Sequence, residues 1–315
     1  MFSNCSSLNS LDVSGFNTES TTYMTNMFNG CSKLTSLDVS GFKTDKVTNM
    51  CCMFSDCSSL TRLDVSRFKT DKVTDISGMF SGCSNLTSLN VNGFKTDKVT
   101  YMDGMFSGCS SLTELDLSNF NFENVEYMYS MFQDCSRLEK LDLGNSKAES
   151  TVHMAQMFYQ CSALTSLDLS NFNTESVIHM SAMFYRCSAL TSLDLSGFNT
   201  ESVINMSQMF YGCNQLRTIY ANEKWTTDNV NNGRVMFEEC LNLVGGSGTE
   251  FSLSHTGLDY AHIDGGPDNP GYLTNKATNT KKGDVNGDGE VNVGDIGLSA
   301  TSWQVTALLT RSWLT

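Results

Sequence analysis

Ten of the twelve cysteines in this 315-residue chain are spaced at a fixed interval. Each lies 26 residues after the one before it, except for a last step of 27. They are Cys5, Cys31, Cys57, Cys83, Cys109, Cys135, Cys161, Cys187, Cys213 and Cys240. A constant period near 26 predicts a solenoid, in which each repeat forms one coil and is stable only when stacked on its neighbours.

The same residue pattern surrounds each cysteine, approximately M-F-x-x-C-x-x-L-x-x-L-D-[LV]-S-x-F-x-T-[DE]-x-V-x-x-M. Length alone would suggest two domains, but one repeat array accounts for most of the chain. We expect the solenoid in 1–244, a C-terminal capping segment in 245–274, a linker in 275–282 and a separate short motif in 283–315. Met1 and Phe2 already fill the M-F positions with no signal sequence before them, so we expect the natural protein to begin further upstream.

The first half of each repeat predicts a short strand. In the unit from Leu190, Leu193 and Leu195 alternate with Asp194, the pattern of a strand with one buried face. Phe198 follows in a turn, and we expect its ring to point inward.

The second half of each repeat is predicted to be a short helix. Thr200 and Glu201 have the chemistry of a helix N-terminus, and Gly212 marks a helix end. Apolar residues recur after Glu201 at steps of three and four, as on one helical face: Val203, Met206, Met209, Phe210 and Cys213. The predicted fold is an α/β solenoid like a leucine-rich repeat, with one strand per repeat in a parallel sheet and a short helix on the opposite side.

The ladder cysteines are predicted to be free and buried. Equivalent residues of stacked coils lie about 5 Å apart, beyond the Cβ separation of roughly 3.5 to 4.5 Å that a disulfide requires. Cys51 and Cys52 lie outside the ladder. Either is a candidate exposed reactive thiol, and the sequence assigns them no function.

Composition and motifs exclude several functions. The chain has 34 acidic and 20 basic side chains, a net charge of -14, which argues against nucleic acid as a partner. No run of eighteen apolar residues exists, so we expect no membrane span. No G-x-S-x-G or H-E-x-x-H motif is present, and we expect a protein that is not an enzyme.

Two columns of repeated side chains are candidate ligand-binding sites. The first is a carboxylate column, which is either a solubilising ladder or a stripe for a basic ligand or cations: Asp12, Asp38, Asp64, Asp116, Asp142, Asp168 and Asp194, with Asn90 in register. The second is Tyr159, Tyr185 and Tyr211, which form either a structural stack or a contact surface for protein or carbohydrate. Both interpretations of the tyrosines predict partly exposed rings.

His153 and His179 share one repeat position. Two imidazoles about 5 Å apart are a candidate transition-metal pair. Because Asn49, Asp75 and Tyr101 occupy the same position, we favour an ordinary place on the helix surface.

The C-terminal motif predicts a calcium site. Gly289 lies at the sharp-turn position of a loop whose oxygen ligands follow EF-hand spacing: Asp284, Asn286, Asp288, the Glu290 carbonyl, Asn292 and Asp295. The loop resembles one half of a type I dockerin, and no second loop follows in 297–315. That resemblance implies Ca²⁺ as a cofactor and a cohesin module as an alternative partner.

The repeat itself resembles the BspA-like family of bacterial surface proteins. The M-F-x-x-C-x-x-L and L-D-L-S-x-F-x-T segments carry the resemblance, together with the ending from Asn242 to Tyr272. It implies an extracellular or cell-surface protein that adheres to host or cell-surface macromolecules. The alternative is a component recruited to a cohesin-bearing assembly through the dockerin-like tail.

Overall fold

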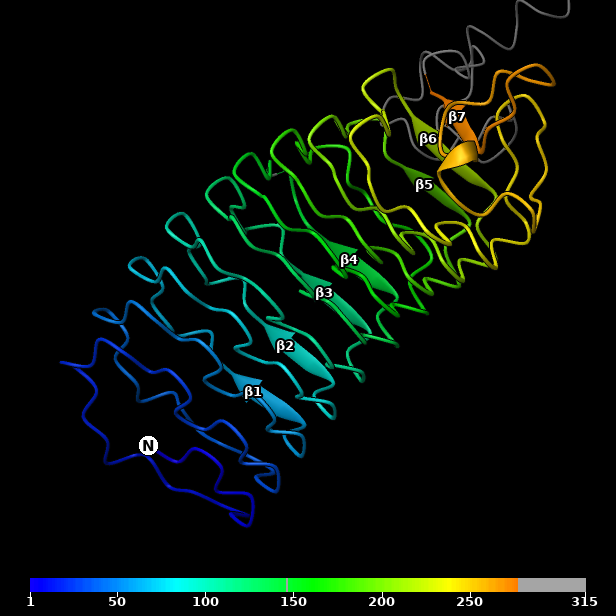
Figure 1. Ribbon diagram of the computed structural model, residues 1–315. Coiled ribbons are helices and arrows are strands. Elements are labelled where there is room, and N and C mark those ends of the chain that lie inside the picture. Colours follow the sequence, from blue (N-terminus) through cyan, green and yellow to red (C-terminus); the bar gives the residue numbers. More distant parts are fainter. Residues whose placement is uncertain (146, 277–315) are drawn as a thin grey trace, which may run out of the picture.

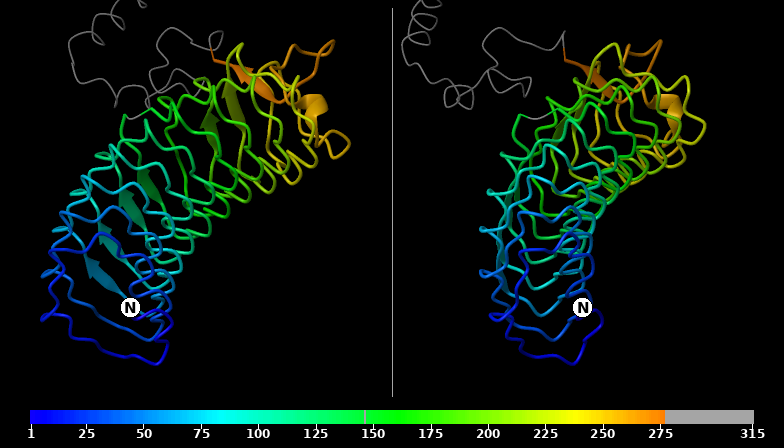
Figure 2. Two further views of the ribbon diagram at one scale, coloured as in Figure 1. Left: turned by 60° about the vertical axis from the view of Figure 1, so that its left-hand side comes forward. Right: turned by 90° about the vertical axis from the view of Figure 1, so that its left-hand side faces the viewer.

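The structure, a computed structural model, describes residues 1–145 and 147–276 and is a parallel β-solenoid (Figure 1). Successive coils stack along one axis, and the axis bends into an arc (Figure 2). One long side carries short strands, and we call it the strand face. The other, from the position of His153 to that of Cys161 in each repeat, carries tandem turns, and we call it the turn face.

The strands are three or four residues long and pair in parallel. They are β1 (Arg62–Asp64), β2 (Ser88–Asn90), β3 (Glu114–Asp116), β4 (Lys140–Asp142), β5 (Ser192–Asp194), β6 (Thr218–Ala221) and β7 (Leu273–Asn275). The sheet is interrupted, because β1 pairs only with β2, β3 only with β4, and β5, β6 and β7 form a third group. Equivalent residues are in register, as Leu63 with Leu89 and Leu115 with Leu141. The predicted parallel pairing of short strands is confirmed in this interrupted form, but a strand in every repeat is not, because the segments around Asp12, Asp38 and Asp168 contain none.

The turn face is joined by a longer and continuous ladder. Parallel bridges connect one position of each coil to the next: Tyr23, Asn49, Asp75, Tyr101, Tyr127, His153, His179, Asn205 and Asn232. The amide of Phe54 donates to the carbonyl of Met79 at 2.9 Å, and the amide of Phe80 donates to that of Met105 at 2.9 Å. These bonds hold neighbouring coils together along the whole turn face.

The predicted helix on this side is wrong. The described residues contain a single 3-10 helix, Leu258–Tyr260, which lies outside the repeats. In its place each coil has consecutive four-residue turns, in which the amide of Met209 donates to Met206 and that of Cys213 to Phe210. The third residue of each turn has a positive φ, 60° at Gln208 and 72° at Gly212, which is the type II geometry and ends any helix.

Two physical reasons explain this correction. Packed helices need interaxial distances of 8 to 10 Å, whereas coils joined by backbone hydrogen bonds are about 4.8 Å apart. Every second amide on this side also pairs with the next coil, as those of Gln208 and Phe210 do, and is not available for a bond within a helix. Turns of four residues place apolar side chains at steps of three and four, so their spacing imitates a helical face.

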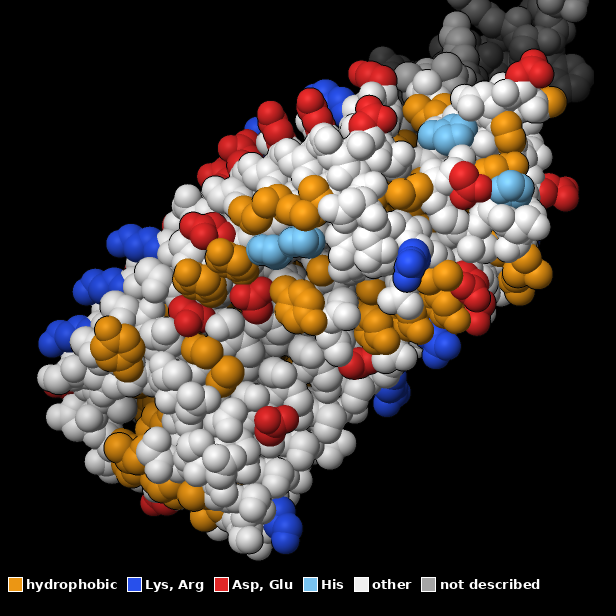
Figure 3. All heavy atoms as spheres, viewed as in Figure 1, with side chains coloured by type: hydrophobic (Ala, Val, Ile, Leu, Met, Phe, Trp, Pro, Cys, Tyr) orange, Lys and Arg blue, Asp and Glu red, His pale blue; other side chains and the backbone are white. Residues whose placement is uncertain are grey.

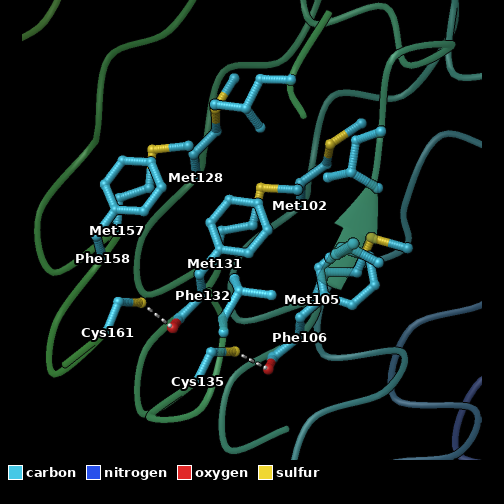
Figure 4. Packing of buried hydrophobic residues seen from close by; sticks show 14 of the residues in the cluster. Met102, Met105, Phe106, Met128, Met131, Phe132, Cys135, Met157, Phe158 and Cys161 are labelled. Atoms are coloured by element: carbon cyan, nitrogen blue, oxygen red, sulfur yellow. Dashed lines mark hydrogen bonds between the residues drawn. The ribbon is translucent and has the colours of Figure 1, made fainter. Parts of the chain in front are cut away.

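A column of stacked phenylalanine rings runs through the core (Figure 4). Adjacent rings lie 5.4 to 5.9 Å apart between centroids and are nearly parallel. The column consists of Phe2, Phe28, Phe54, Phe80, Phe106, Phe132, Phe158, Phe184, Phe210 and Phe237. The methionines and leucines of the frame pack around it in one cluster, so a single core extends along the solenoid.

The ladder cysteines lie beside this column as free thiols, as predicted, and all but Cys5 are buried. Each buried thiol donates to the phenylalanine carbonyl of the preceding coil: Cys135 to Phe106 at 3.2 Å and Cys161 to Phe132 at 3.1 Å (Figure 4). That carbonyl also accepts the amide of the cysteine in its own coil. Both of its acceptor positions are therefore used.

The threonine predicted to cap a helix instead joins adjacent coils. The Thr70 hydroxyl donates to the Lys95 carbonyl at 3.0 Å and accepts the Lys95 amide at 2.6 Å. Thr44 makes the same two bonds with Lys69. The threonine hydroxyl therefore accepts a backbone amide as predicted, but this amide belongs to the next coil and not to a helix N-terminus.

The C-terminal segment covers the last coil. β7 pairs with β6, and the Tyr272 ring meets Phe237 edge-on, 5.2 Å between centroids. The buried Asp264 carboxylate accepts the amides of Ser247, Thr249 and Gly266 and the Thr249 hydroxyl, at 2.8 to 3.1 Å. One side chain thus holds together the loops of this segment.

The repeat frame has substitutions in the middle of the chain. Phe122 replaces the usual threonine, and position 146 has serine in place of the usual phenylalanine. The buried Phe122 ring lies 6.1 Å from Phe120 and 5.9 Å from Phe172, so it contacts rings two repeats apart. The expectation that the segment between Cys135 and Cys161 is the least stable remains a prediction, and hydrogen exchange tests it.

Candidate binding surfaces

On the strand face, the repeated aspartates have a structural role in each coil. Each carboxylate accepts the amide of the residue two positions later at 2.8 to 3.0 Å, forming an Asx turn that ends the strand segment. Hydrogen bonds from the hydroxyl and amide of Ser118 lower the pKa of Asp116. Asn90 makes the same bond to the amide of Asn92 at 3.0 Å. The turn, and not the charge, is what the repeat requires here.

A groove of about 870 Å³ follows β1 to β4 on this face. Asp116 and Asp142 lie in its lining with Arg62, Glu114 and Lys140, so its charge is mixed. Asp194 is different, because the Lys276 ammonium is paired with it. The carboxylate column is therefore not one uniform stripe.

The turn face has a column of aromatic rings that is partly open to solvent. Tyr101, Tyr127, His153 and His179 stack in sequence with centroids 5.2, 5.5 and 4.9 Å apart. The Tyr101 side chain is exposed, and Tyr127 and both histidines are partly exposed. We call these four residues the first aromatic column. Figure 3 shows this face, with hydrophobic side chains and histidines along its middle.

Tyr159, Tyr185 and Tyr211 form the second aromatic column on the same face. Their rings stack at 4.5 and 4.8 Å and are partly exposed. The Arg186 guanidinium lies 5.5 Å from the Tyr185 ring centroid and 5.9 Å from that of Tyr211. A hydrogen bond to Glu239 at 3.0 Å raises the pKa of Tyr211, so this hydroxyl stays protonated.

Stacking decides which part of each ring meets solvent. Within a column the ring faces contact one another, so the edges and polar atoms point outward. A sugar ring binds an aromatic side chain through the aromatic face, whereas a protein surface also uses ring edges and hydroxyl groups. The two columns therefore favour a protein ligand.

The histidine pair does not form a metal site. Burial and the neighbouring His179 lower the pKa of His153, but the two rings are stacked within 11° of parallel. Imidazole lone pairs lie in the ring plane, so those of stacked rings do not converge on one ion. The described part of the chain contains no group of three or more His, Cys, Asp or Glu residues arranged to hold a metal. Both histidines lie on the tandem turns of the surface and not on a helix.

The sequence-predicted sites thus separate. Asp116, Asp142, Asp168 and Asp194 lie on the strand face, whereas Tyr159, Tyr185 and Tyr211 lie on the turn face. The calcium ligands Asp284, Asn286, Asp288, Glu290, Asn292 and Asp295 lie outside the described residues. The first aromatic column was not predicted, although Tyr101, Tyr127 and His153 follow one another at the repeat interval.

No helix within the described residues is long and apolar enough to cross a bilayer. The continuous ladder and the phenylalanine column define the class of this molecule, a parallel β-solenoid built from 26-residue repeats. Its sequence matches the family described as "Mycoplasma protein of unknown function, DUF285" over residues 1–66, 60–166 and 138–245, and the chain belongs to that family.

Among the solved structures that are similar to this chain are two repeat proteins. One is a leucine-rich repeat protein from Bacteroides ovatus, with 20% identity, a TM-score of 0.39, and coverage of 78% of this chain and 67% of that one. The other is the functional domain of InlJ from Listeria monocytogenes, which includes a cysteine ladder, with 17% identity and a TM-score of 0.20. This alignment covers 80% of this chain and 57% of the InlJ domain. Among curated proteins, none matches the chain.

Proposed function

We propose that this protein is a non-catalytic scaffold that binds a protein partner through the two aromatic columns of its turn face. The observation that carries the proposal is the pair of stacked, partly exposed ring columns on one face. The frame requires neither, because other repeats have Asn49 or Ser107 at the same positions. Tyrosine edges and hydroxyls with a nearby guanidinium are the groups enriched where proteins bind proteins.

The proposed setting is extracellular or at the cell surface, with adhesion to host or cell-surface macromolecules as the role. The resemblance of the repeats to BspA-like proteins supports it. The curvature of the solenoid supports the binding of a macromolecule, because the turn face lies on the inner side of the arc in Figure 2 and forms a concave surface for a convex partner.

The test compares two sets of variants of the whole chain. Purified extracellular proteins are measured for binding by surface plasmon resonance, and each ligand found is measured again with the variants. Tyr159→Ala, Tyr185→Ala and Tyr211→Ala together should weaken binding by tenfold or more, since each buried aromatic contact contributes about 1 to 2 kcal/mol. Binding to glycans alone, or full affinity in the triple variant, would contradict the proposal.

The control set is Asp116→Asn, Asp142→Asn and Asp168→Asn on the strand face. Asn90 shows that asparagine keeps the Asx turn, so these changes remove charge without disturbing the coil. We expect unchanged affinity. Loss of binding in this set alone would move the site to the carboxylate column.

A second candidate is recruitment to a cohesin-bearing assembly through a calcium-dependent tail. The EF-hand spacing from Asp284 to Asp295 supports it. Isothermal titration of the whole chain with Ca²⁺ should show one site that Asp284→Asn weakens. No heat of binding would remove this candidate and leave the aromatic scaffold untouched.

A further inference from the structure

Two cysteines outside the ladder lie together on the turn face. Cys51 and Cys52 are the central residues of the turn in which the Met53 amide donates to the Met50 carbonyl. Their Sγ atoms are 3.4 Å apart, and both side chains are partly exposed. Cys52 has a positive φ of 53°, so it occupies the left-handed position of the turn. Both thiols therefore point to the same side of the chain.

The repeat frame does not require sulfur at these two positions. The equivalent pairs in the following coils are Ser77 with Gly78, and Tyr129 with Ser130. Ser130 has a φ of 55°, nearly that of Cys52, so serine fits the left-handed position as well. The reason for a dithiol must therefore lie in its chemistry.

The next coil leaves room for the pair. A Cβ atom at Gly78 would come within 2.9 Å of the Cys52 Sγ, so glycine allows the thiol its place. The Ser77 hydroxyl lies 3.3 Å from the Cys51 Sγ. The two sulfur atoms thus pack against Ser77 and Gly78 of the next coil and remain partly exposed to solvent.

We propose that Cys51 and Cys52 form a surface dithiol that low-molecular-weight disulfides oxidise reversibly to a vicinal disulfide. The Cys51 thiolate attacks one sulfur of the small disulfide, forming a mixed disulfide and releasing one thiolate. The Cys52 thiol then loses its proton and attacks the Cys51 Sγ, which releases the second small thiolate. Two protein thiols are oxidised and one small disulfide is reduced to two thiols.

The order of these steps follows from the surroundings of each thiol. Burial, followed by the hydrogen bond with Cys51, raises the pKa of Cys52 to about 12. Cys52 therefore keeps its proton in the first step, which we assign to Cys51 because the thiolate is the reactive form. In the mixed disulfide Cys51 no longer carries a thiol, so its hydrogen bond and charge no longer oppose the ionisation of Cys52 in the second step.

The closed form is easily reduced. Adjacent Cα atoms are about 3.8 Å apart across a trans peptide, below the usual range of about 4.4 to 6.8 Å for disulfides, so the ring is strained. Strained and exposed disulfides have the more oxidising potentials typical of reversible sites. This property distinguishes the pair from a structural cross-link.

The experiment uses the whole native chain and oxidised glutathione as the oxidant. After incubation with oxidised glutathione, the protein is unfolded, alkylated and digested with trypsin. The mass of the peptide 47–62 is then measured by mass spectrometry. This peptide also contains Cys57, a buried ladder thiol that serves as an internal control. We expect the loss of two hydrogen atoms with one alkylated thiol, and three alkylated thiols once the protein is reduced with dithiothreitol.

Matched serine variants separate the two steps. Cys52→Ser should keep glutathione at Cys51 as a mixed disulfide, because no second thiol displaces it. Cys51→Ser should lose this adduct. Three alkylated thiols in the oxidised wild-type peptide, a lasting glutathione adduct there, or a disulfide that includes Cys57 would each overturn the proposal.

Discussion

At the residue scale, the same amino acid has two roles in this chain. The nine buried ladder thiols are small apolar side chains that also donate a weak hydrogen bond across coils. Burial raises the pKa of Cys135 and of Cys213 to about 12, so these thiols remain protonated and keep their donor. Cys51 and Cys52 are partly exposed, so a small disulfide can reach their sulfur atoms, which it cannot do at the buried ladder thiols.

Cys135→Ala should lower the free energy of unfolding by about 1 to 3 kcal/mol, because it leaves a cavity and removes the thiol donor to Phe106. Urea unfolding followed by circular dichroism measures the change. Cys5→Ala is the control, since Cys5 is partly exposed in the first coil, and a change within about 0.5 kcal/mol is expected. Equal effects of the two substitutions would show that the donor bond contributes nothing.

At the element scale, each coil combines an extended segment, which is a strand in most coils, with tandem turns, and local exceptions compensate one another. Phe122 departs from the frame by adding a ring, and position 146 departs from it by lacking one. The Phe122 ring contacts Phe120 and Phe172, which belong to coils on either side of the missing phenylalanine. A substitution toward the consensus at one of these positions is therefore unfavourable by itself.

Phe122→Thr should destabilise the protein by about 3 kcal/mol although it restores the common residue, since it removes a buried ring. The midpoint of thermal unfolding measures the loss. The double variant Phe122→Thr with Ser146→Phe restores both positions of the frame and should recover most of it. Additive losses in the double variant would show that the two exceptions are independent.

The C-terminal cap should depend on pH through Asp264. Burial raises the pKa of this carboxyl, but hydrogen bonds from Gly266, Thr249 and Ser247 outweigh burial and hold the pKa below its usual value. Its stabilisation is therefore fully present above the unfolded pKa of about 3.9 and is lost as the pH falls through the lower folded pKa. The cap weakens in acid.

Asp264→Asn should cost about 1 to 3 kcal/mol at pH 7, because an amide group replaces one acceptor oxygen among several donors. Unfolding of both proteins as a function of pH gives the check. The difference between them should be constant above about pH 5 and shrink below about pH 4. A difference that persists unchanged in acid would assign the effect to packing.

At the scale of the whole molecule, the two long faces are held unequally. The turn face has an uninterrupted ladder from Tyr23 to Asn232, whereas the strand face is interrupted between β2 and β3 and between β4 and β5. In both views of Figure 2 the strands lie on the outer side of the arc. The outer path is the longer one, so its strands pair only in groups.

Hydrogen exchange should reproduce this inequality. Amides of the phenylalanine column, such as Phe54, Phe80 and Phe106, should exchange most slowly because each is buried and bonded to the next coil. Amides at the interruption between β2 and β3 should exchange faster than those inside the β5, β6 and β7 group. Equal protection on both faces would contradict a bend with the ladder on its inner side.

The repeat period in the amino-acid sequence is sufficient to predict the solenoid. Because equivalent residues recur at a fixed interval, stacking puts Leu193 beside its equivalents and excludes disulfides between ladder cysteines. It also determined which side chains are buried, since the apolar positions of the frame are the core. The residue type at each position of the repeat is sufficient for both conclusions.

The backbone conformation between those positions depends on contacts between coils, which the sequence pattern does not contain. Steps of three and four residues suit a helix and tandem turns equally, and hydrogen bonds to the neighbouring coil select the turns. Gly212 has a positive φ, and in the sequence this glycine suggests the end of a helix. Arg186 and Gln160 occupy the equivalent position with a positive φ as well, but their residue type gives no sign of it. The distance between Cys51 and Cys52, and the stacking of Tyr127 on His153, likewise depend on a turn geometry that only contacts between coils determine.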